Sequence, residues 1–480
     1  MALKIFNRVT RQLEEFKPVQ EGKVNMYVCG PTVYDYPHIG HGKTYVAFDV
    51  VVRYLRHLGY DVLYVQNITD VGHLLDSGED RILRKARQSS SRPMAIVEKY
   101  ATIYFNNMDA LGVHRPDISP RASGHIPEQI EMVQDLIAKG HAYESNGSVY
   151  FDVISWPEYG KLSGRKVENN EEGARLAINA EKRHPADFAL WKKADPEHIL
   201  RWNSPWGEGF PGWHVECSAM AAKYLGSTFD IHGGGIDNIF PHNDCEIAQS
   251  EAAHDGAAFA NYWMLTGSLT LEGVKMSKSL GNTLTIENAL KQYRPEAIRY
   301  FLLTSHYSNP IDFSDQALAD ADKAWKRVWG AVSKARAKAS DEGDVETEVA
   351  DMLSATRAAF KANMDNNFTT PSAIADLQDL TRKVNTMLND GNAHSGASWA
   401  AIDALYSELG GTVLGIVPEG GAEDSGSAER EAGLINMLIG MRAEARKNRD
   451  WATSDQIRNQ LKGLGISLLD GTGETSWEID

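Results

Sequence analysis

The sequence predicts an α/β fold built on a split parallel sheet, because strand-like and helical segments alternate along residues 1–314. The run 24–29 is β-prone and ends at Gly30 and Pro31, the segment 44–58 has apolar residues at helical spacing, and 62–65 is a second apolar run. A strand–helix–strand unit of this kind builds a parallel sheet of the Rossmann type, whose ligands lie at the carboxyl ends of the strands. The segment 29–43 is therefore expected at that edge.

The second half of the sheet is expected to resume after an insertion at about 144–193, where the pattern changes to short, polar, glycine-containing pieces. A strand-like run follows at 228–232, three glycines occupy 233–235, and a helical pattern begins after Pro241. The sequence thus predicts one Rossmann-type domain at 1–314 that the insertion divides.

The remainder of the chain is predicted to be mostly helical. Beyond about residue 315, glycine and proline are confined to a few places, which indicates an all-α region at 315–417. The stretch 418–427 is rich in Gly, Ser, Asp and Glu, which predicts a flexible linker at 418–429. A small terminal module is expected at 430–480.

Composition and charge exclude several classes of protein. With 480 residues, of which 42% are hydrophobic, the chain is expected to fold into a few domains. No apolar run approaches the roughly 20 residues that span a bilayer, and no secretory signal is present, so a cytoplasmic enzyme without a membrane partner is expected. Three cysteines are too few for a disulfide framework, and the net charge of -16 requires any RNA partner to meet locally basic faces.

Two histidines, His38 and His41, stand on a turn with Gly40 between the first predicted strand and its helix. Glycine lets the backbone approach a phosphate closely, and imidazoles beside a helix N-terminus can donate hydrogen bonds to phosphate oxygens as charge develops. The alternative is a surface loop that happens to contain two histidines. This motif alone does not decide between the two interpretations.

A second motif, Lys275-Met276-Ser277-Lys278-Ser279, lies in a loop that contains Gly and Ser. Two lysines there can close over a triphosphate and offset the charge of a pyrophosphate leaving group, whereas a lone motif of this kind is usually a solvated basic loop. The two motifs occur in this order near opposite ends of a split α/β domain. Together they resemble the paired nucleotide signatures of class I aminoacyl-tRNA synthetases and favour ATP-dependent activation of an amino acid.

Four residues from three predicted segments form a possible metal centre. His242 and Glu246 stand four positions apart in a predicted helix, so they share one face, while Cys217 precedes them and Cys29 ends the first strand. If all four converge, they form a mixed set of donors that suits Zn²⁺. The alternative is that the cysteines are small buried residues and that the other two form a surface pair.

The segments around these residues resemble cysteinyl-tRNA synthetases. The match begins at Cys29-Gly30-Pro31-Thr32-Val33-Tyr34-Asp35-Tyr36-Pro37-His38-Ile39-Gly40-His41 and continues through the catalytic region to the terminal module. The further matching segments are 67–71, 212–220, 230–237, 247–251, 299–303, 454–458 and 464–466.

The resemblance implies a cysteine–tRNA ligase that converts L-cysteine and ATP to cysteinyl-AMP and transfers cysteine to the 3′ end of tRNA(Cys). It implies one Zn²⁺ per chain, Mg²⁺ with the ATP, a monomer, a catalytic domain at 1–314, a tRNA-binding helical region and an anticodon-binding terminal module. The implied zinc ligands are Cys29, Cys217, His242 and Glu246, and the implied substrate-binding residues are Thr69, Trp213 and Asp237. The ATP site would comprise His38, Gly40, His41, Lys275, Ser277 and Lys278, with the two histidines and two lysines catalytic.

A zinc ion explains how such an enzyme selects its substrate in one step. Zinc that takes the substrate sulfur as an added ligand binds thiolate strongly and the hydroxyl of serine poorly. A pocket that relies on shape alone separates near-isosteres by only about 10–200-fold, which usually requires an editing site, and no segment of this sequence requires one. Trp213 is expected to pack over the bound amino acid and Asp237 to face its ammonium; the alternative for Trp213 is a core aromatic.

The sequence departs from the family at three places. The metal-binding helix contains His242-Asn243-Asp244-Cys245-Glu246 where the family usually has His-His-Glu-Asn-Glu, so Cys245 is close enough to compete for the metal. We expect a bystander thiol there. Gly72-His73-Leu74 replaces the commoner acidic pair, which we interpret as a subfamily variant, and 472–480 lacks the usual basic end, which weakens the case for tRNA contact by the terminal module.

Two basic clusters are candidates for phosphate contact, although most such runs are solvated helix faces. Tryptophans near them either stack on bases or face a core. Two other functions stay open: a cysteine ligase that acts on a small amine, which would lack the helical end, and a catalytically idle synthetase-like protein that binds RNA. The clusters are Lys323, Lys326, Arg327, Lys334, Arg336 and Lys338, then Arg442, Arg446, Lys447 and Arg449, and the tryptophans are Trp325, Trp329 and Trp451.

Overall fold

The computed structural model describes residues 2–74, 79–166, 181–196, 198–271, 273–275, 283–419, 425–470 and 475–479. The chain divides into two compact units, Met1–Val417 and Pro418–Asp480, and each unit has its own apolar core. None of the helices in these described ranges is long and apolar enough to cross a membrane.

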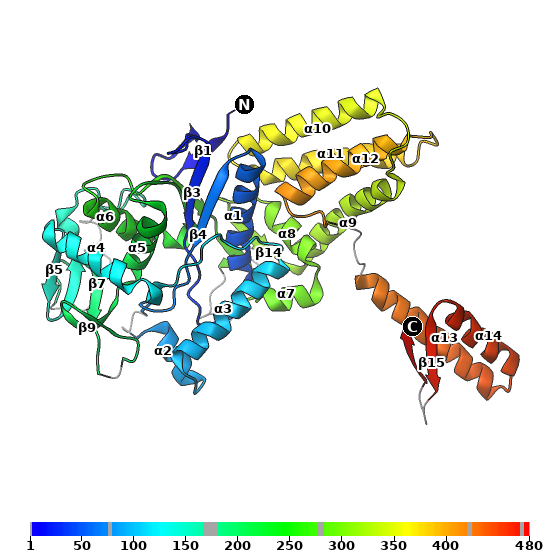
Figure 1. The fold of residues 1–480 in the computed structure, drawn as a ribbon, viewed down its shortest axis with the longest axis horizontal. Coiled ribbons are helices and arrows are strands. Elements are labelled where there is room, and N and C mark those ends of the chain that lie inside the picture. Colours follow the sequence, from blue (N-terminus) through cyan, green and yellow to red (C-terminus); the bar gives the residue numbers. More distant parts are fainter. Residues whose placement is uncertain are drawn as a thin grey trace. The chain divides into compact units, whose positions relative to one another are not determined.

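A four-stranded parallel sheet lies inside the first unit, with the strand order β11-β10-β3-β4 (Figure 1). Strands β3 and β10 pair although the insertion separates them in sequence, so the sheet is assembled from two halves of the chain. This topology confirms the predicted α/β fold with a split parallel sheet. The strands are β3 (Lys23–Val28), β4 (Asp61–Gln66), β10 (Phe229–Gly235) and β11 (Ala260–Thr266).

Helix α1 (Ile39–His57) crosses from β3 to β4 and begins at the carboxyl edge of the sheet. It begins earlier than the helix that periodicity predicts at 44–58, because the backbone N–H of His38 donates to Nδ1 of His41, 3.1 Å away, which caps the first turn. The helix N-terminus and both histidines therefore lie at the edge where parallel sheets bind ligands.

The insertion forms a separate five-stranded antiparallel sheet, with the order β5-β6-β7-β9-β8. The insertion extends to Pro211, beyond the predicted end at residue 193. The reason is that β8 and β9 form a hairpin, and β9 pairs with β7, so both strands belong to this sheet. Helices α4, α5 and α6 pack on it around a core that includes Trp191. The strands are β5 (Ala142–Ser145), β6 (Ser148–Phe151), β7 (Phe188–Lys193), β8 (Trp202–Ser204) and β9 (Gly207–Pro211), and the helices are α4 (Ile126–Ala138), α5 (Trp213–Leu225) and α6 (Asp244–Ala253).

Shorter elements complete the first unit around the central sheet. A hairpin stands near the N-terminus, two helices follow β4, and a three-stranded sheet of order β13-β12-β14 follows β11. These elements are β1 (Lys4–Asn7), β2 (Gln12–Glu15), α2 (Arg81–Gln88), α3 (Pro93–Ala110), β12 (Leu269–Leu271), β13 (Val274–Lys275), β14 (Ile311–Phe313), α7 (Ile286–Gln292) and α8 (Pro295–Leu303).

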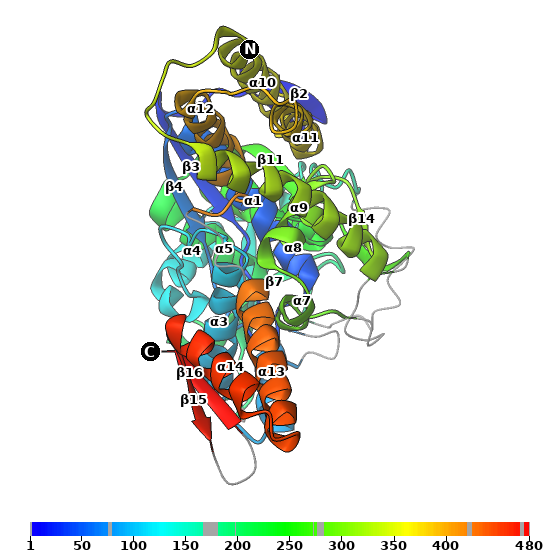
Figure 2. The ribbon, with the colours of Figure 1, turned by 90° about the vertical axis from the view of Figure 1, so that its right-hand side faces the viewer.

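The predicted helical region contains α9 (Asp315–Lys338), α10 (Thr347–Asp365), α11 (Thr370–Met387) and α12 (Gly396–Tyr406), and α10 and α11 lie side by side (Figures 1 and 2). Trp325 of α9 is buried and donates from Nε1 to the carbonyl of Ile416, 2.8 Å away, so it is a core aromatic. One apolar cluster continues from the central sheet into these helices.

A buried ion pair joins α1 and α8, two helices of the first unit. Arg299 of α8 pairs with Asp49 of α1, and each residue is about 1–2% exposed. The guanidinium also donates from Nε to the carbonyl of Leu414, 2.6 Å away. Gly415 has a φ of +65°, and a Cβ there would lie 2.7 Å from that Nε, so the close approach requires glycine.

The second unit consists of helices α13 (Ser425–Lys447) and α14 (Trp451–Gly463) and a hairpin of β15 (Ile466–Asp470) and β16 (Thr475–Ile479). Helix α13 begins inside the segment 418–429 that composition predicts as a linker. This unit has a small apolar core of its own, which is formed by Ile435, Ile457, Leu461, Ile466 and Leu468.

Candidate active site and metal centre

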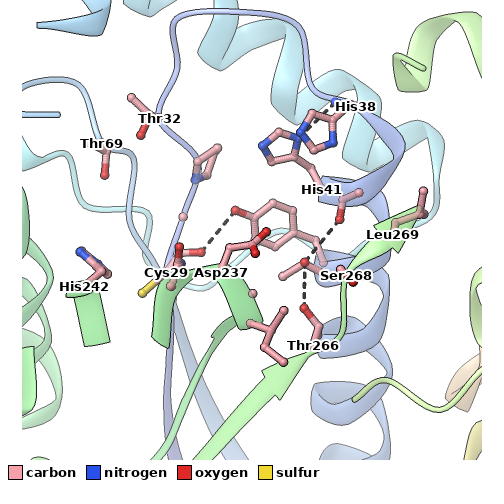
Figure 3. Close-up of a pocket in the computed structure, with 18 of the residues that line it drawn as sticks. Cys29, Thr32, His38, His41, Thr69, Asp237, His242, Thr266, Ser268 and Leu269 are labelled. Atoms are coloured by element: carbon pink, nitrogen blue, oxygen red, sulfur yellow. Dashed lines mark hydrogen bonds between the residues drawn. The ribbon is translucent and has the colours of Figure 1, made fainter. Parts of the chain in front are cut away.

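A cavity of about 280 Å³ opens at the carboxyl ends of β3, β4 and β10 (Figure 3). Loops that follow three parallel strands and the N-terminus of α1 form its wall, which is the edge that the split-sheet prediction indicates. The cavity brings together most of the site residues that the sequence singles out: Cys29, His38, Gly40, His41, Thr69, Trp213, Cys217, Asp237 and His242.

The two histidines of the first motif lie against each other at the start of α1. Their ring centroids are 3.9 Å apart, and both line the cavity. Lys43, one turn further, is buried and donates from Nζ to the carbonyls of Gly267, 2.8 Å away, and Asn309. Lys43 thereby fastens the start of α1 to the segment that leads from β11 to the second motif. The sequence did not predict this role, because a lysine in a glycine-rich turn suggests a phosphate contact as readily as a structural one.

Four donor atoms converge beneath the cavity. The ligand atoms of Cys29, Cys217, His242 and Glu246 all lie within 4.8 Å of one another, and all four residues are buried. Nε2 of His242 is 2.9 Å from Oε1 of Glu246, and Sγ of Cys29 is 3.7 Å from the same oxygen. The four residues come from the end of β3, from α5, from the irregular turn Ile239–Asn243 and from α6.

The chemistry of these donors fits Zn²⁺. Two thiols, an imidazole and a carboxylate form a mixed soft and borderline set, which is typical of tetrahedral zinc. A hydrogen bond with Cys29 and burial together raise the pKa of Cys217 well above its usual range. Buried thiols so close together take the thiolate form when a cation is present, so the cluster is compatible with a bound metal ion.

Three residues outside the donor set orient it, two of them buried and His214 partly buried. Oε2 of Glu246 is 2.9 Å from Nε2 of His232 and 3.0 Å from Nδ2 of Asn243, which leaves Oε1 facing the other donors. Nδ1 of His242 is 3.0 Å from Nδ1 of His214, whose pKa is lowered to about 3 by burial and by the nearby His242. A neutral His214 accepts the proton of His242 Nδ1, so Nε2 of His242 is left as the ligand atom.

Sequence reasoning missed these orienting residues, although His214 and His232 lie inside segments that it matched to the family. The available signal was two histidines beside glycine or tryptophan in otherwise apolar segments. Asn243 stood out only as one of the positions at which the sequence departs from the family's usual pattern.

Trp213 lies between two imidazoles rather than in an apolar core. Its ring stacks on His73 at 3.9 Å and on His242 at 4.3 Å, and it lines the cavity. Nδ1 of His73 is 2.7 Å from Oγ1 of Thr32, another lining residue. His73, where the sequence departs from the family's usual acidic pair, is therefore part of the wall of the site.

Thr69 and Asp237 complete the wall next to the donor cluster. Thr69 follows β4, and Asp237 lies in the turn Ile236–Asn238 that follows β10. Figure 3 shows Asp237 beside Cys29 and Thr69 across the cavity from it. A carboxylate and a hydroxyl at these places can bind an ammonium group beside the metal donors.

Comparison with known proteins gives the family. The model for the class I (C) tRNA synthetase catalytic domain matches residues 15–323, and that for the DALR domain matches 359–418. Cysteine–tRNA ligases of Chlorobium luteolum and Deinococcus radiodurans are each 48% identical over 99% of this chain and over 99% and 96% of their own length. An enzyme of Thermus thermophilus is 45% identical over all of both chains.

The chain belongs to the cysteine–tRNA ligase family.

Solved structures of other class I synthetases share the fold. Methionyl-tRNA synthetase of Mycobacterium tuberculosis, in complex with methionyl-adenylate, superposes with a TM-score of 0.56 at 15% identity, over 82% of this chain and 89% of the other. The LeuRS–tRNA–LeuAMS complex of Agrobacterium radiobacter K84 gives 0.59 at 13% identity, over 84% and 85%. At these identities the likeness establishes the class I fold.

Cys245, the residue that departs from the usual pattern of cysteine–tRNA ligases, lies apart from the four donors. Its thiol is fully buried in the core of the insertion, and Sγ is 3.6 Å from the hydroxyl of Tyr159. Cys245 lies on a different face of α6 from its neighbour Glu246, because successive residues of a helix are about 100° apart. The geometry supports the expectation of a bystander thiol.

The second motif of the ligase family is described only at its start. Lys275 ends strand β13, where it pairs with Thr270 of β12, and β12 begins at Leu269 in the cavity wall. The side chain of Lys275, together with Ser277 and Lys278, lies outside the described residues, so their predicted roles in ATP binding stay predictions.

Proposed function

We propose that this protein activates L-cysteine with ATP and transfers it to the 3′ end of tRNA(Cys). One observation carries the proposal: the donor cluster of Cys29, Cys217, His242 and Glu246 opens onto the same cavity as His38 and His41. A site that selects sulfur and a site that binds phosphate are thus adjacent. Membership of the cysteine–tRNA ligase family supports the same reaction.

Selection of cysteine depends on the donor cluster. Zn²⁺ held by Cys29, Cys217, His242 and Glu246 would supply a further coordination position that takes a substrate thiolate strongly and a serine hydroxyl poorly. Asp237 and Thr69 bind the substrate ammonium, and Trp213 covers the side chain. The substrate carboxylate is thereby directed toward His38 and His41.

In the first step the cysteine carboxylate attacks the α-phosphate of ATP, which forms the mixed anhydride cysteinyl-AMP and releases pyrophosphate. His38 and His41 donate hydrogen bonds to the phosphates from the N-terminus of α1, next to Gly40. Lys275, Ser277 and Lys278 bind the triphosphate from the second motif, and Mg²⁺ accompanies it. Positioning and charge stabilisation carry this step, without a covalent enzyme intermediate.

In the second step the terminal ribose hydroxyl of the tRNA attacks the carbonyl carbon of cysteinyl-AMP. A new ester bond forms, the bond from that carbon to the phosphate oxygen breaks, and the hydroxyl proton passes to the AMP that leaves. We assign the helical region 315–417 to binding of the tRNA and the module 430–480 to its anticodon. We further infer that the protein acts as a monomer in the cytoplasm, where tRNA is charged.

The test is transfer of labelled cysteine or serine to total tRNA, with and without a metal chelator. We expect cysteine to be charged, serine to be rejected, and chelation to remove charging. Formation of cysteinyl-AMP without charging of tRNA would favour a cysteine ligase that acts on a small amine. Absence of both reactions would identify an idle synthetase-like protein.

A further inference from the structure

A second cavity, of about 160 Å³, lies against the first on the other side of the two histidines. The two cavities share the lining residues Pro31, Thr32, His38, His41 and His73. A group bound in the second cavity therefore lies next to whatever occupies the first. The β12 strand, which leads to the lysine motif, lines only the first cavity, so the phosphates of ATP belong there.

Three of the six lining residues that the second cavity does not share are tyrosines, and the others are Val33, Asp35 and Pro37. Tyr34, Tyr100 and Tyr104 line it, and Tyr36 stands edge-on to Tyr100 with ring centroids 5.3 Å apart. The hydroxyl of Tyr104 donates to Oε1 of Gln66, 2.7 Å away, so this ring is a fixed wall. Tyr36, at the rim rather than in the lining, is 37% exposed, whereas the lining residues Tyr100 and Tyr104 are 4% and 2% exposed. Aromatic faces grouped in this way are the usual platform for a planar base.

Cations surround the aromatic rings. Nη1 of Arg81 donates to the hydroxyl of Tyr34, 3.2 Å away, and Nζ of Lys85 lies 3.1 Å from Oδ1 of Asp35 and 5.5 Å from the centre of the Tyr100 ring. Nζ of Lys99 lies 5.3 Å from the same ring. Each of these positive charges is therefore held within reach of a ligand on the aromatic faces.

Helix α2, which supplies Arg81 and Lys85, is basic throughout. Its sequence RILRKARQ has four cations and no acidic residue, in a chain whose net charge is -16. It packs beside α3, which supplies Tyr100 and Lys99 (Figure 1). A basic helix next to clustered aromatic rings is a combination that binds single-stranded nucleic acid.

We propose that this second cavity, with α2 at its rim, binds the single-stranded 3′ end of the tRNA during transfer. The inference rests on the proposed function and assigns the acceptor's place in it. A base stacked on Tyr34 or Tyr100 would put its ribose at the shared wall of Thr32 and His73, beside the carbonyl of the adenylate. The phosphates that precede it would meet α2. A small amine is disfavoured as the ligand of this cavity, because the cations at its rim repel an ammonium group.

The test separates the two half-reactions in full-length enzyme with zinc bound. Adenylate formation is followed by pyrophosphate exchange, and transfer by a single turnover from preformed enzyme-bound cysteinyl-AMP to tRNA(Cys). The variants are Tyr100→Ala and Lys85→Met. The conservative variant Tyr100→Phe keeps the aromatic face. Lys223→Met, which removes an exposed lysine of α5 that pairs with Glu128 at 3.1 Å, is the matched control for charge.

We expect Tyr100→Ala to lower transfer by about 5- to 100-fold more than adenylate formation, the range of one base-stacking contact. Tyr100→Phe restores most of the transfer. Lys85→Met lowers the salt dependence of tRNA binding by about one phosphate contact, and Lys223→Met leaves it as in the wild type. Adenylate formation in each preparation reports that the variant is folded.

Two results would overturn this inference and leave the proposed function intact. The first is an equal loss in both half-reactions, which would assign the cavity to ATP or to a structural role. The second is transfer at the wild-type rate in both Tyr100→Ala and Lys85→Met. Wild-type enzyme that forms cysteinyl-AMP but charges only small amines would instead overturn the proposed function, and this inference with it.

Discussion

At the level of single residues, the orientation of Glu246 depends on buried neighbours that are not donors themselves. His232 is fully buried, and its ring stacks on Trp263 at 4.0 Å, so its Nε2 is fixed opposite the Glu246 carboxylate. Residues that orient a metal ligand in this way contribute to affinity without touching the metal. His232 and Asn243 should thus matter for zinc more than for the fold of the sheet.

We predict that His232→Ala weakens zinc binding by about 10- to 100-fold, since Glu246 then loses one of its two orienting contacts. The measurement is competition for zinc with a chromophoric chelator, and circular dichroism checks that the fold persists. An unchanged affinity would show that Asn243 alone orients the carboxylate.

Cys245 gives the opposite prediction, because its thiol belongs to the core of the insertion. Cys245→Ser should keep a full equivalent of zinc, whereas Cys29→Ser should lose it, and metal analysis of the two purified variants compares them directly. Loss of zinc from the Cys245 variant would mean that the donor set is wrongly assigned.

At the level of elements, the pair of Asp49 and Arg299 connects α1, whose N-terminus bears the two histidines, to α8 and the end of the helical region. Burial raises the pKa of Asp49, but the nearby Arg299 and Arg53 outweigh this effect and hold the pKa below its usual value. The ionised carboxylate is thus favoured by folding. Its stabilising contribution is fully present above the unfolded value of about 3.9 and is lost as the pH falls through the folded value.

We predict that Asp49→Asn lowers the free energy of unfolding at pH 7 by roughly 3–5 kcal/mol, because it leaves the buried Arg299 without its partner. Urea unfolding at pH 7 measures this loss. Between pH 4 and pH 2 the variant should lose less stability than the wild type, since it lacks the carboxylate that titrates there. Parallel acid curves for the two proteins would contradict the assignment.

At the level of the whole molecule, the two units have separate apolar cores, and the cavity and the donor cluster lie entirely within Met1–Val417. We therefore expect the activation of cysteine not to require the second unit. Recognition of a tRNA, in contrast, extends over a ligand much longer than the cavity, so a second unit can contribute binding energy away from the reacting atoms.

We predict that a chain of residues 1–417 still forms cysteinyl-AMP but charges tRNA(Cys) at least about tenfold less efficiently, as expected when one of two linked binding units is removed. Pyrophosphate exchange and aminoacylation of tRNA, measured on the same preparation, separate the two effects. Full charging by the shortened chain would remove the proposed anticodon role of the terminal module.

Much of this protein could be predicted from local patterns. The alternation of strands and helices, the position of the first nucleotide motif and the four donors follow from spacing and family resemblance, because periodicity and short motifs are properties of neighbouring residues. The role of the second motif stays a prediction. The extent of the insertion was underestimated, since the hairpin of β8 and β9 is polar and short, and only its pairing with β7 makes it part of the sheet.

The kinds of donor in the candidate metal site are a property of the sequence alone: two thiols, an imidazole and a carboxylate, with His242 and Glu246 four positions apart. Their convergence is a property of the folded chain. Cys29 joins the cluster because β3 pairs with β10, where the N–H of Cys29 donates to the carbonyl of Gly233, 2.9 Å away. The same packing turns Cys245 away from the cluster and His232 toward it. These outcomes depend on the order of strands in the sheet and on the packing of helices against it, which no local pattern encodes.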